Sequence, residues 1–83
     1  MPAMQHRMLD ESDLIAVDKV LLDVLAEDGR ATPQLLAFAI EDRTGESYTR
    51  QHISGRLKRL VEHSHVENVR DTGVYELVDD PRE

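Results

Sequence analysis

Residues 49–60 read TRQHISGRLKRL, a stretch that combines helical periodicity with a concentration of positive charge. Four of the ten Lys and Arg residues of the chain lie in it. One arc of a helical wheel holds the apolar residues of this stretch, Ile53, Leu57 and Leu60, together with Val61, which directly follows it. Thr49 stands where a side-chain oxygen can cap the first turn. The spacing predicts a helix over residues 50–63.

The opposite arc of this helix and its flanks are polar and mostly basic. The residues there are Gln51, His52, Ser54, Gly55, Arg56, Lys58, Arg59 and Glu62. Gly55 costs a helix about 1 kcal/mol relative to alanine, and its missing side chain would let another molecule approach closely. On the wheel, Arg50 leans toward the apolar arc. A basic arc of this kind is either a solvated face or a binding surface, and the neighbouring elements decide between the two.

The segment nearest the N-terminus with helical spacing is 13–28, in which apolar residues form one stripe. Asp10, Ser12 or Asp13 can cap its first turn, because short polar side chains accept hydrogen bonds from the free N–H groups there. Gly29 follows as a suitable C-terminal cap. We therefore expect a first helix over this range.

A second helix is predicted over 33–42, between the first helix and the basic one. Thr32 can act as its N-cap, and Pro33 at the first helical position needs no N–H partner. Because its apolar residues are closely spaced, we expect it to be mostly buried, with Phe38 in the core beside Tyr48 and Tyr75. The other side chains that we expect to be largely buried are Leu21, Leu25, Leu36, Ile53, Leu57 and Leu60.

The C-terminal region changes period, from helical spacing to short runs rich in valine. Two such runs, around Val66–Val69 and Val74–Val78, flank the sequence RDTG. Gly73 can adopt a positive φ, so this pattern predicts a two-stranded β-hairpin over about 65–78. The order of elements is then three helices followed by a hairpin, an α+β arrangement typical of a winged helix-turn-helix.

The sequence also resembles a known group of proteins. The motifs are RATP at the start of the second helix, RLKRLVEH at the end of the third, and YELVDDP after the hairpin. With these motifs the chain is similar to small winged-helix proteins of halophilic archaea that resemble a halophilic phage repressor. The resemblance covers residues from about 14 to the end. It implies a fold that binds duplex DNA and acts in transcriptional regulation.

Two positions depart from the pattern of that family. The turn EDRTGES between the second and third helices is longer than the usual tight turn, which leaves their crossing angle open. Ser64 stands where a glycine commonly ends the third helix, so a residue less suited to positive φ must form that corner.

The chain is acidic overall but unevenly so. Its formal net charge is −7, with 17 Asp and Glu against 10 Lys and Arg, of which eight are Arg. Residues 1–46 carry a net charge of −6, residues 47–70 carry +3, and residues 71–83 carry −4. Acid-rich, lysine-poor chains are typical of halophilic archaea. The basic segment is therefore a directed feature that the net charge hides.

These observations define a candidate DNA interface on the third helix and the hairpin. Gln51 can pair with adenine, and Arg50 or Arg56 with guanine. Lys58 and Arg59 suit phosphates, as does Thr49 with the helix N-terminus, and Arg70 could reach a flanking phosphate or the minor groove. The complete set of expected DNA-binding residues is Thr49, Arg50, Gln51, His52, Ser54, Gly55, Arg56, Lys58, Arg59 and Arg70.

Other classes of function find little support in the sequence. No nucleophile, base and oxyanion hole come together, so we expect no enzyme and no cofactor. The spacing of His52, His63 and His65 does not imply convergence on a metal ion. The chain has no cysteine, no apolar run long enough for a membrane span and no signal-peptide pattern, so we expect a cytoplasmic protein.

The competing hypothesis is a winged-helix protein-interaction module that binds no DNA. It would be favoured if Glu46, Glu62 or Asp71 neutralised Arg56, Lys58 and Arg59 in ion pairs. A homodimer is suggested only weakly, by Met4, Met8 and Leu9 ahead of the first helix. We divide the chain into an N-terminal extension (1–12), a winged-helix domain (13–78) and a polar C-terminal tail (79–83) that we expect to fray.

Overall fold

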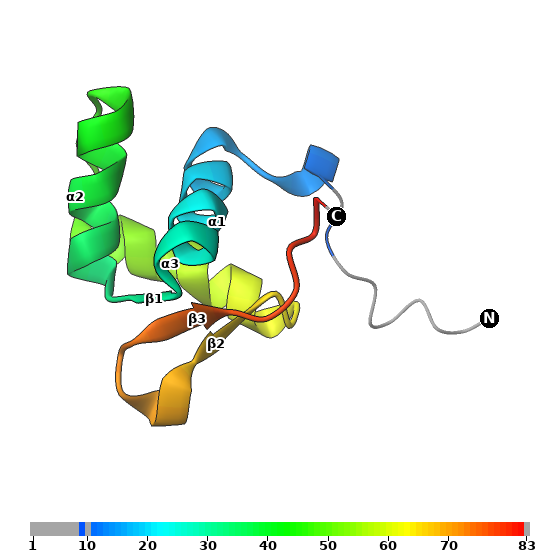
Figure 1. Ribbon diagram of the computed structural model, residues 1–83. Coiled ribbons are helices and arrows are strands. Elements are labelled where there is room, and N and C mark those ends of the chain that lie inside the picture. Colours follow the sequence, from blue (N-terminus) through cyan, green and yellow to red (C-terminus); the bar gives the residue numbers. More distant parts are fainter. Residues whose placement is uncertain (1–8, 10, 83) are drawn as a thin grey trace.

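The computed structural model describes residues 9 and 11–82 of the chain. This part forms an α+β fold in which the helices lie on one side of a small antiparallel sheet (Figure 1). The helices are α1 (Ala16–Asp28), α2 (Pro33–Thr44) and α3 (Arg50–Glu62). The strands are β1 (Arg30–Ala31), β2 (Val66–Asn68) and β3 (Tyr75–Leu77). Two short 3-10 turns complete the fold, η2 (Glu11–Asp13) and η3 (Val69–Asp71).

The helices α2 and α3 each start directly after the N-capping residue expected from the sequence. Thr32 Oγ1 accepts a hydrogen bond from the Leu35 N–H, and Thr49 Oγ1 accepts one from the His52 N–H. The helix α1 ends at Gly29, whose φ of 88° few other residues adopt readily. These three predictions are confirmed, because each depends on local chemistry that the sequence contains.

The start of α1 differs from the prediction. The helix begins at Ala16 rather than at residue 13, and none of the expected residues caps it. Residues 11–13 form the separate turn η2, and Ile15, the residue before the helix, has an extended backbone. Asp18, inside the first turn, accepts a hydrogen bond from the Ile15 N–H at 3.0 Å and so supplies the missing partner from within the helix.

The sheet has three strands rather than the two that the sequence predicts. Its order is β1-β3-β2, and both pairs are antiparallel. The strand β1 was missed because it is two residues long and shows no periodicity. It forms because the extended chain between the end of α1 and the start of α2 lies along the otherwise free edge of β3, where Arg30 pairs with Glu76.

A single hydrophobic core lies between the three helices and the sheet. Each predicted core leucine and isoleucine is at most 1% exposed, namely Leu21, Leu25, Leu36, Ile53, Leu57 and Leu60. Tyr75 and Tyr48 pack at the edge of the core and are half-buried. Burial of the apolar arc of α3 fixes its opposite arc toward solvent, which positions the basic residues.

The helix α2 is less buried than the sequence suggests. Phe38, which we expect in the core, is 63% exposed, and Leu35 on the same helix is 58% exposed. Only Leu36 and Ile40 of this helix are fully buried. The reason is that α2 contacts the rest of the molecule along a narrow stripe, so its remaining apolar side chains point to solvent.

Both ends of the described chain pack on the domain instead of fraying. Leu9 is 7% exposed, and its N–H donates to Nε2 of the buried His65. Near the C-terminus, Arg82 binds Asp23 of α1 and Asp80, and these contacts hold the 79–82 segment in place. The hydrogen bonds from Arg82 lower the pKa of the Asp80 carboxyl. Leu9 thus joins the hydrophobic core, and residues 79–82 are held to the domain by polar contacts.

Candidate nucleic-acid interface

The outer face of α3 presents most of the side chains expected to contact DNA. Those that are exposed are Thr49, Arg50, Gln51, His52, Gly55, Lys58 and Arg59, whereas Ser54 and Arg56 are half-buried. Arg50, which the wheel placed toward the core, faces solvent because it stands at the first helical position, beyond the packed part of the helix. The exposed set covers the N-terminal turn and one continuous face.

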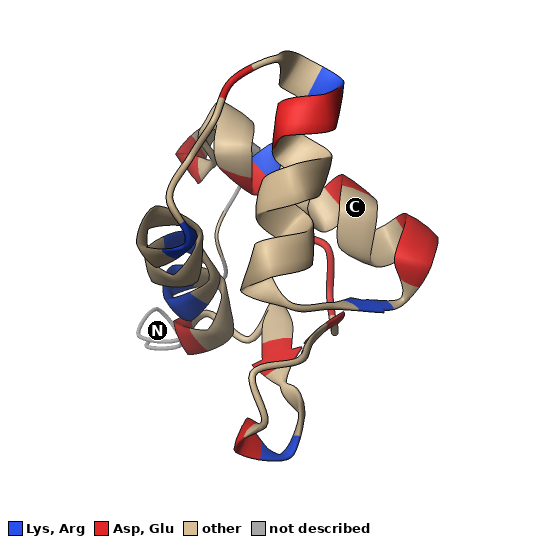
Figure 2. Cartoon of the chain, turned by 90° about the vertical axis from the view of Figure 1, so that its left-hand side faces the viewer, with Lys and Arg blue, Asp and Glu red and all other residues tan. Residues whose placement is uncertain are grey.

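The free positive charge of the described chain is concentrated on this face and on the turn after β2. Arg30, Arg43, Arg56 and Arg82 are all held in ion pairs. Within residues 9 and 11–82, the cations that form no ion pair are Lys19, Arg50, Lys58, Arg59 and Arg70. Figure 2 shows the corresponding bands of Lys and Arg along α3 and at the tip of the hairpin. Four of these five free cations thus belong to the predicted interface.

Arg56 is the exception, because it is bound within the protein. Its Nε and Nη2 donate to the two carboxylate oxygens of Asp18 at 2.8 and 2.6 Å. Asp18 is 1% exposed, and the side chain of Arg56 is 24% exposed. The hydrogen bonds to Asp18 raise the pKa of Arg56, so the guanidinium stays protonated. Arg56, which the sequence led us to expect at the DNA interface, is thus half-buried and paired, and it links α3 to α1.

Asp18 is the residue that the sequence analysis missed. It lies on the buried stripe of α1, one turn after Leu14 and one turn before Leu21, where an acidic side chain is unusual. A buried carboxylate needs a cation or several N–H donors. The sequence therefore contains a signal for this ion pair, because Asp18 is a charged residue at a core position of the first helix.

The N-terminal turn of α3 is well ordered by local contacts. Thr49 caps the helix, and the imidazole of His52 stacks on the ring of Tyr48 with centroids 5.2 Å apart. The Tyr48 hydroxyl donates to Glu46 at 2.7 Å, and this bond raises the pKa of the tyrosine. The exposed N–H groups and the positive end of the helix dipole make this turn suitable for an anion such as a phosphate.

Gly55 lies on the same face, and packing does not require it. A Cβ atom built at this position would meet no atom within 4 Å. Its lack of a side chain therefore leaves open space outside the helix and relieves no contact within the protein. An open strip beside Gln51 and Arg59 is what a recognition helix needs in order to approach base edges closely.

The turn that joins β2 and β3 carries Arg70 at its tip. Arg70 and Asp71 both adopt left-handed conformations, with φ of 52° and 59°, and the Thr72 N–H donates to the Val69 carbonyl at 3.0 Å. Positive φ at both central residues is the geometry of a type I′ turn, which normally contains Asn-Gly. The left-handed backbone at the tip holds the exposed Arg70 away from the sheet.

Ser64 ends α3 as the sequence implied. Its φ of 67° is left-handed, and its N–H donates to the Val61 carbonyl. The next residue, His65, is fully buried, and its Nδ1–H donates to the Asp79 carbonyl at 2.7 Å while Nε2 accepts from Leu9. Both ring nitrogens of His65 are thus used in holding the two ends of the chain.

Comparisons of the chain with protein-family models, with curated proteins and with solved structures found no match. The resemblance to haloarchaeal winged-helix proteins therefore stays a prediction. In the part of the chain that the structure describes, no helix has the length and apolar character needed to cross a membrane. What the molecule does must be argued from the geometry of α3 and its surroundings.

Proposed function

We propose that the chain is a winged helix-turn-helix protein that binds duplex DNA and acts as a sequence-specific, repressor-like transcriptional regulator. In this proposal α3 enters the major groove, and the β2–β3 hairpin forms the wing. The observation that carries it is the distribution of free cations: Arg50, Lys58, Arg59 and Arg70 are exposed and bound to no carboxylate in the described chain. The other arginines are mostly held in ion pairs.

The residues of the interface would divide into two roles. Gln51 and Arg50, on the first turn of α3, are suited to base edges, because amide and guanidinium groups can pair with adenine and guanine in two-bond geometry. Lys58 and Arg59 lie farther along the helix and Arg70 lies at the wing tip, positions suited to phosphates. Arg56 would orient α3 through Asp18 and would not read a base.

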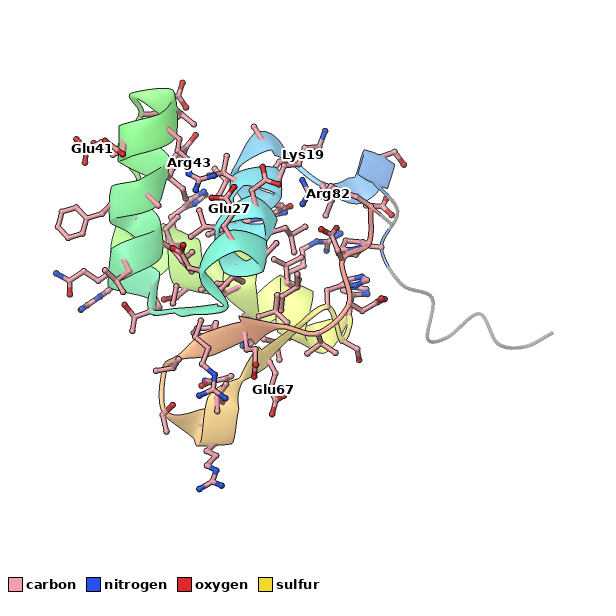
Figure 3. All side chains as sticks on the ribbon, in the orientation of Figure 1. Lys19, Glu27, Glu41, Arg43, Glu67 and Arg82 are labelled. Atoms are coloured by element: carbon pink, nitrogen blue, oxygen red, sulfur yellow. The ribbon has the colours of Figure 1, made fainter. Side chains whose placement is uncertain are left out.

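The test is a titration of random-sequence duplex DNA at about 50 mM salt with two matched variants. The first, Lys58→Ala with Arg59→Ala, removes two proposed phosphate contacts. We expect it to weaken binding roughly tenfold or more, because each neutralised phosphate contributes to affinity at low salt. The second, Lys19→Ala with Arg43→Ala, makes the same change in net charge on α1 and α2, whose side chains are labelled in Figure 3.

The affinity of the control variant for DNA should equal that of the unchanged protein within about twofold. The control variant should also fold normally, because the loss of the exposed ion pair between Arg43 and Glu27 has little effect on stability. Equal weakening by both variants would mean that only net charge matters. No effect of the first variant would show that α3 does not touch DNA.

The second candidate function is a protein-interaction module, and one observation favours it. Leu35 and Phe38 lie one turn apart on α2, exposed, and they are followed by Glu41 and Asp42 on the same helix. Exposed aromatic and aliphatic side chains at this spacing are typical of helices that bind a protein groove. A chain that binds no duplex DNA in the titration above would be assigned to this class.

A further inference from the structure

The strand β2 lies at an edge of the sheet, and its backbone is partly unpaired within the part of the chain that the structure describes. The register places Glu67 opposite Glu76, and the hydrogen bonds Val69 N–H to Val74 O and Val78 N–H to His65 O lie two residues to either side. Antiparallel pairs alternate between bonded and non-bonded residues. Glu67 therefore bonds to β3, and the N–H and C=O groups of Val66 and Asn68 point toward the free edge.

An apolar groove runs beside this edge. It has a volume of about 410 Å³ and is lined by Val61, Ser64, Val66, Glu67, Asn68 and Val78. Its walls come from the end of α3, from β2 and from the residue after β3. Val78 is 58% exposed on its rim. An extended backbone bound to the edge of β2 could therefore place apolar side chains in the groove.

The charges across the sheet show which side chain such a segment would carry next to Glu67. Arg30, Glu76 and Glu67 form one row across β1, β3 and β2. Arg30 binds Glu76 at 3.7 Å, but Glu67 is exposed at the end of the row with another carboxylate as its neighbour. Figure 3 shows Glu67 on the side of β2 away from the helices. Like charges opposite each other in a sheet are unfavourable, so a cation on the free side of Glu67 would be stabilised.

We propose that the edge of β2 binds an extended segment of a partner protein as an added antiparallel strand, with the pattern apolar–basic–apolar. The two apolar residues would pair with Val66 and Asn68 and face the groove. The Lys or Arg between them would lie opposite Glu67, in the non-bonded pair where side chains are closest. This site shares no residue with the proposed DNA interface, although β2 also belongs to the proposed wing, and the proposal does not depend on DNA binding.

A second copy of the chain does not fit this edge. Antiparallel pairing of β2 with β2 of another molecule, centred on the middle residue, would place Glu67 against Glu67. That arrangement would add a third carboxylate to the row and is unfavourable for the reason given above. The acidic end of the row favours a basic partner.

The experiment is an NMR titration of the ¹⁵N-labelled chain with the blocked peptide Ser-Val-Arg-Val-Ser. We expect saturable shifts at β2 and slower hydrogen exchange of the Val66 and Asn68 amides, with the Glu67 amide unchanged because it already bonds to β3. The peptide Ser-Val-Glu-Val-Ser should bind more weakly. In the variant Glu67→Lys the preference between the two peptides should reverse, with a change of roughly fivefold for each.

Three results would overturn the proposal. The first is the absence of saturable shifts at β2, and the second is equal binding of the two peptides. The third is concentration-dependent dimerisation through β2, measured by sedimentation, since a second copy would then be the occupant. Because Glu67 is exposed and accepts no hydrogen bond from another element, the variant should fold, which its unchanged core resonances would show.

Discussion

Asp18 lies on the inner side of α1 with 1% of its surface exposed and binds the guanidinium of Arg56 through two hydrogen bonds. The same carboxylate accepts the Ile15 N–H, so it serves the start of α1 and the position of α3 together. Ionised groups this deep are stable only when paired. At the scale of single residues, this contact means that Arg56 acts within the protein, whereas its neighbours Lys58 and Arg59 lie on the exposed face of α3.

Replacing Arg56 with alanine should lower the free energy of unfolding by about 2–3 kcal/mol, because it leaves a buried carboxylate without its cation. The value lies below that for a fully buried pair, since about a quarter of the arginine side chain is in solvent. Urea unfolding followed by circular dichroism measures it. Arg50→Ala, at an exposed and unpaired position, is the control and should change stability by less than about 0.5 kcal/mol.

An Arg56→Ala protein with unchanged stability but altered DNA sequence preference would contradict this assignment. It would mean that the guanidinium leaves Asp18 and contacts a base in the complex. The two roles are thus separated by measuring unfolding and binding on the same variant.

At the scale of elements, the β2–β3 hairpin contains two of the three residues other than glycine that have a positive φ among the described residues. Arg70 and Asp71 occupy consecutive left-handed positions, which glycine and asparagine adopt far more readily than other residues. Asn68 compensates in part, because its Oδ1 accepts the Gly73 N–H at 2.9 Å and closes the loop. The turn therefore holds its shape despite residues that do not favour it.

Asp71→Gly should stabilise the protein by about 0.5–1 kcal/mol, because glycine removes the strain of positive φ at the second central position of the turn. Thermal unfolding by calorimetry measures the effect. Thr72→Gly is the matched control, since Thr72 has a φ of −99° and its hydroxyl donates to the Val69 carbonyl. That variant should be destabilised. Equal effects of the two substitutions would show that strain at Asp71 is not significant.

The elements that the sequence predicted well are those with local signals. The helices α2 and α3 begin directly after the expected N-caps Thr32 and Thr49, because capping depends on residues within one turn. The strand β1 and the exposure of Phe38 could not be predicted in this way. Both depend on which surfaces meet in three dimensions: β1 exists because β3 is beside it, and Phe38 is exposed because α2 packs along a narrow stripe.

The sequence indicates which residues make up the basic face of α3, but it does not indicate the ion pair between Arg56 and Asp18. The residues of the basic arc other than Ser54 and Arg56 are exposed as the wheel indicates, because the apolar arc of α3 is buried. The Asp18–Arg56 contact joins residues 38 positions apart, and periodicity within one helix carries no information about it. The roles of Gln51 and of the free cations in binding stay predictions.

At the scale of the whole molecule, the charge is arranged as a basic face on an acidic body. Residues 1–46 and 71–83 are net negative, and only the segment that contains α3 and the turn tip is net positive. Acidic surfaces elsewhere would repel DNA in misdocked orientations, so they favour approach by the α3 face. The affinity for DNA should therefore fall steeply as the salt concentration rises, although the negative net charge of the whole protein repels DNA.

If Lys58, Arg59 and Arg70 each neutralise one phosphate, one protomer should show a slope of about −2.7 in a plot of log binding constant against log salt, from about −0.9 for each contact. The Lys58→Ala, Arg59→Ala variant should flatten this slope to about −0.9. Fluorescence anisotropy of a labelled duplex between roughly 50 and 300 mM salt measures both. The Debye length falls from about 14 to about 6 Å over that range, so attraction between more distant charges fades while direct phosphate contacts remain. A slope near zero for the unchanged protein would mean that binding, if seen, does not release counterions from phosphates. The basic face would then be available for an acidic protein partner instead.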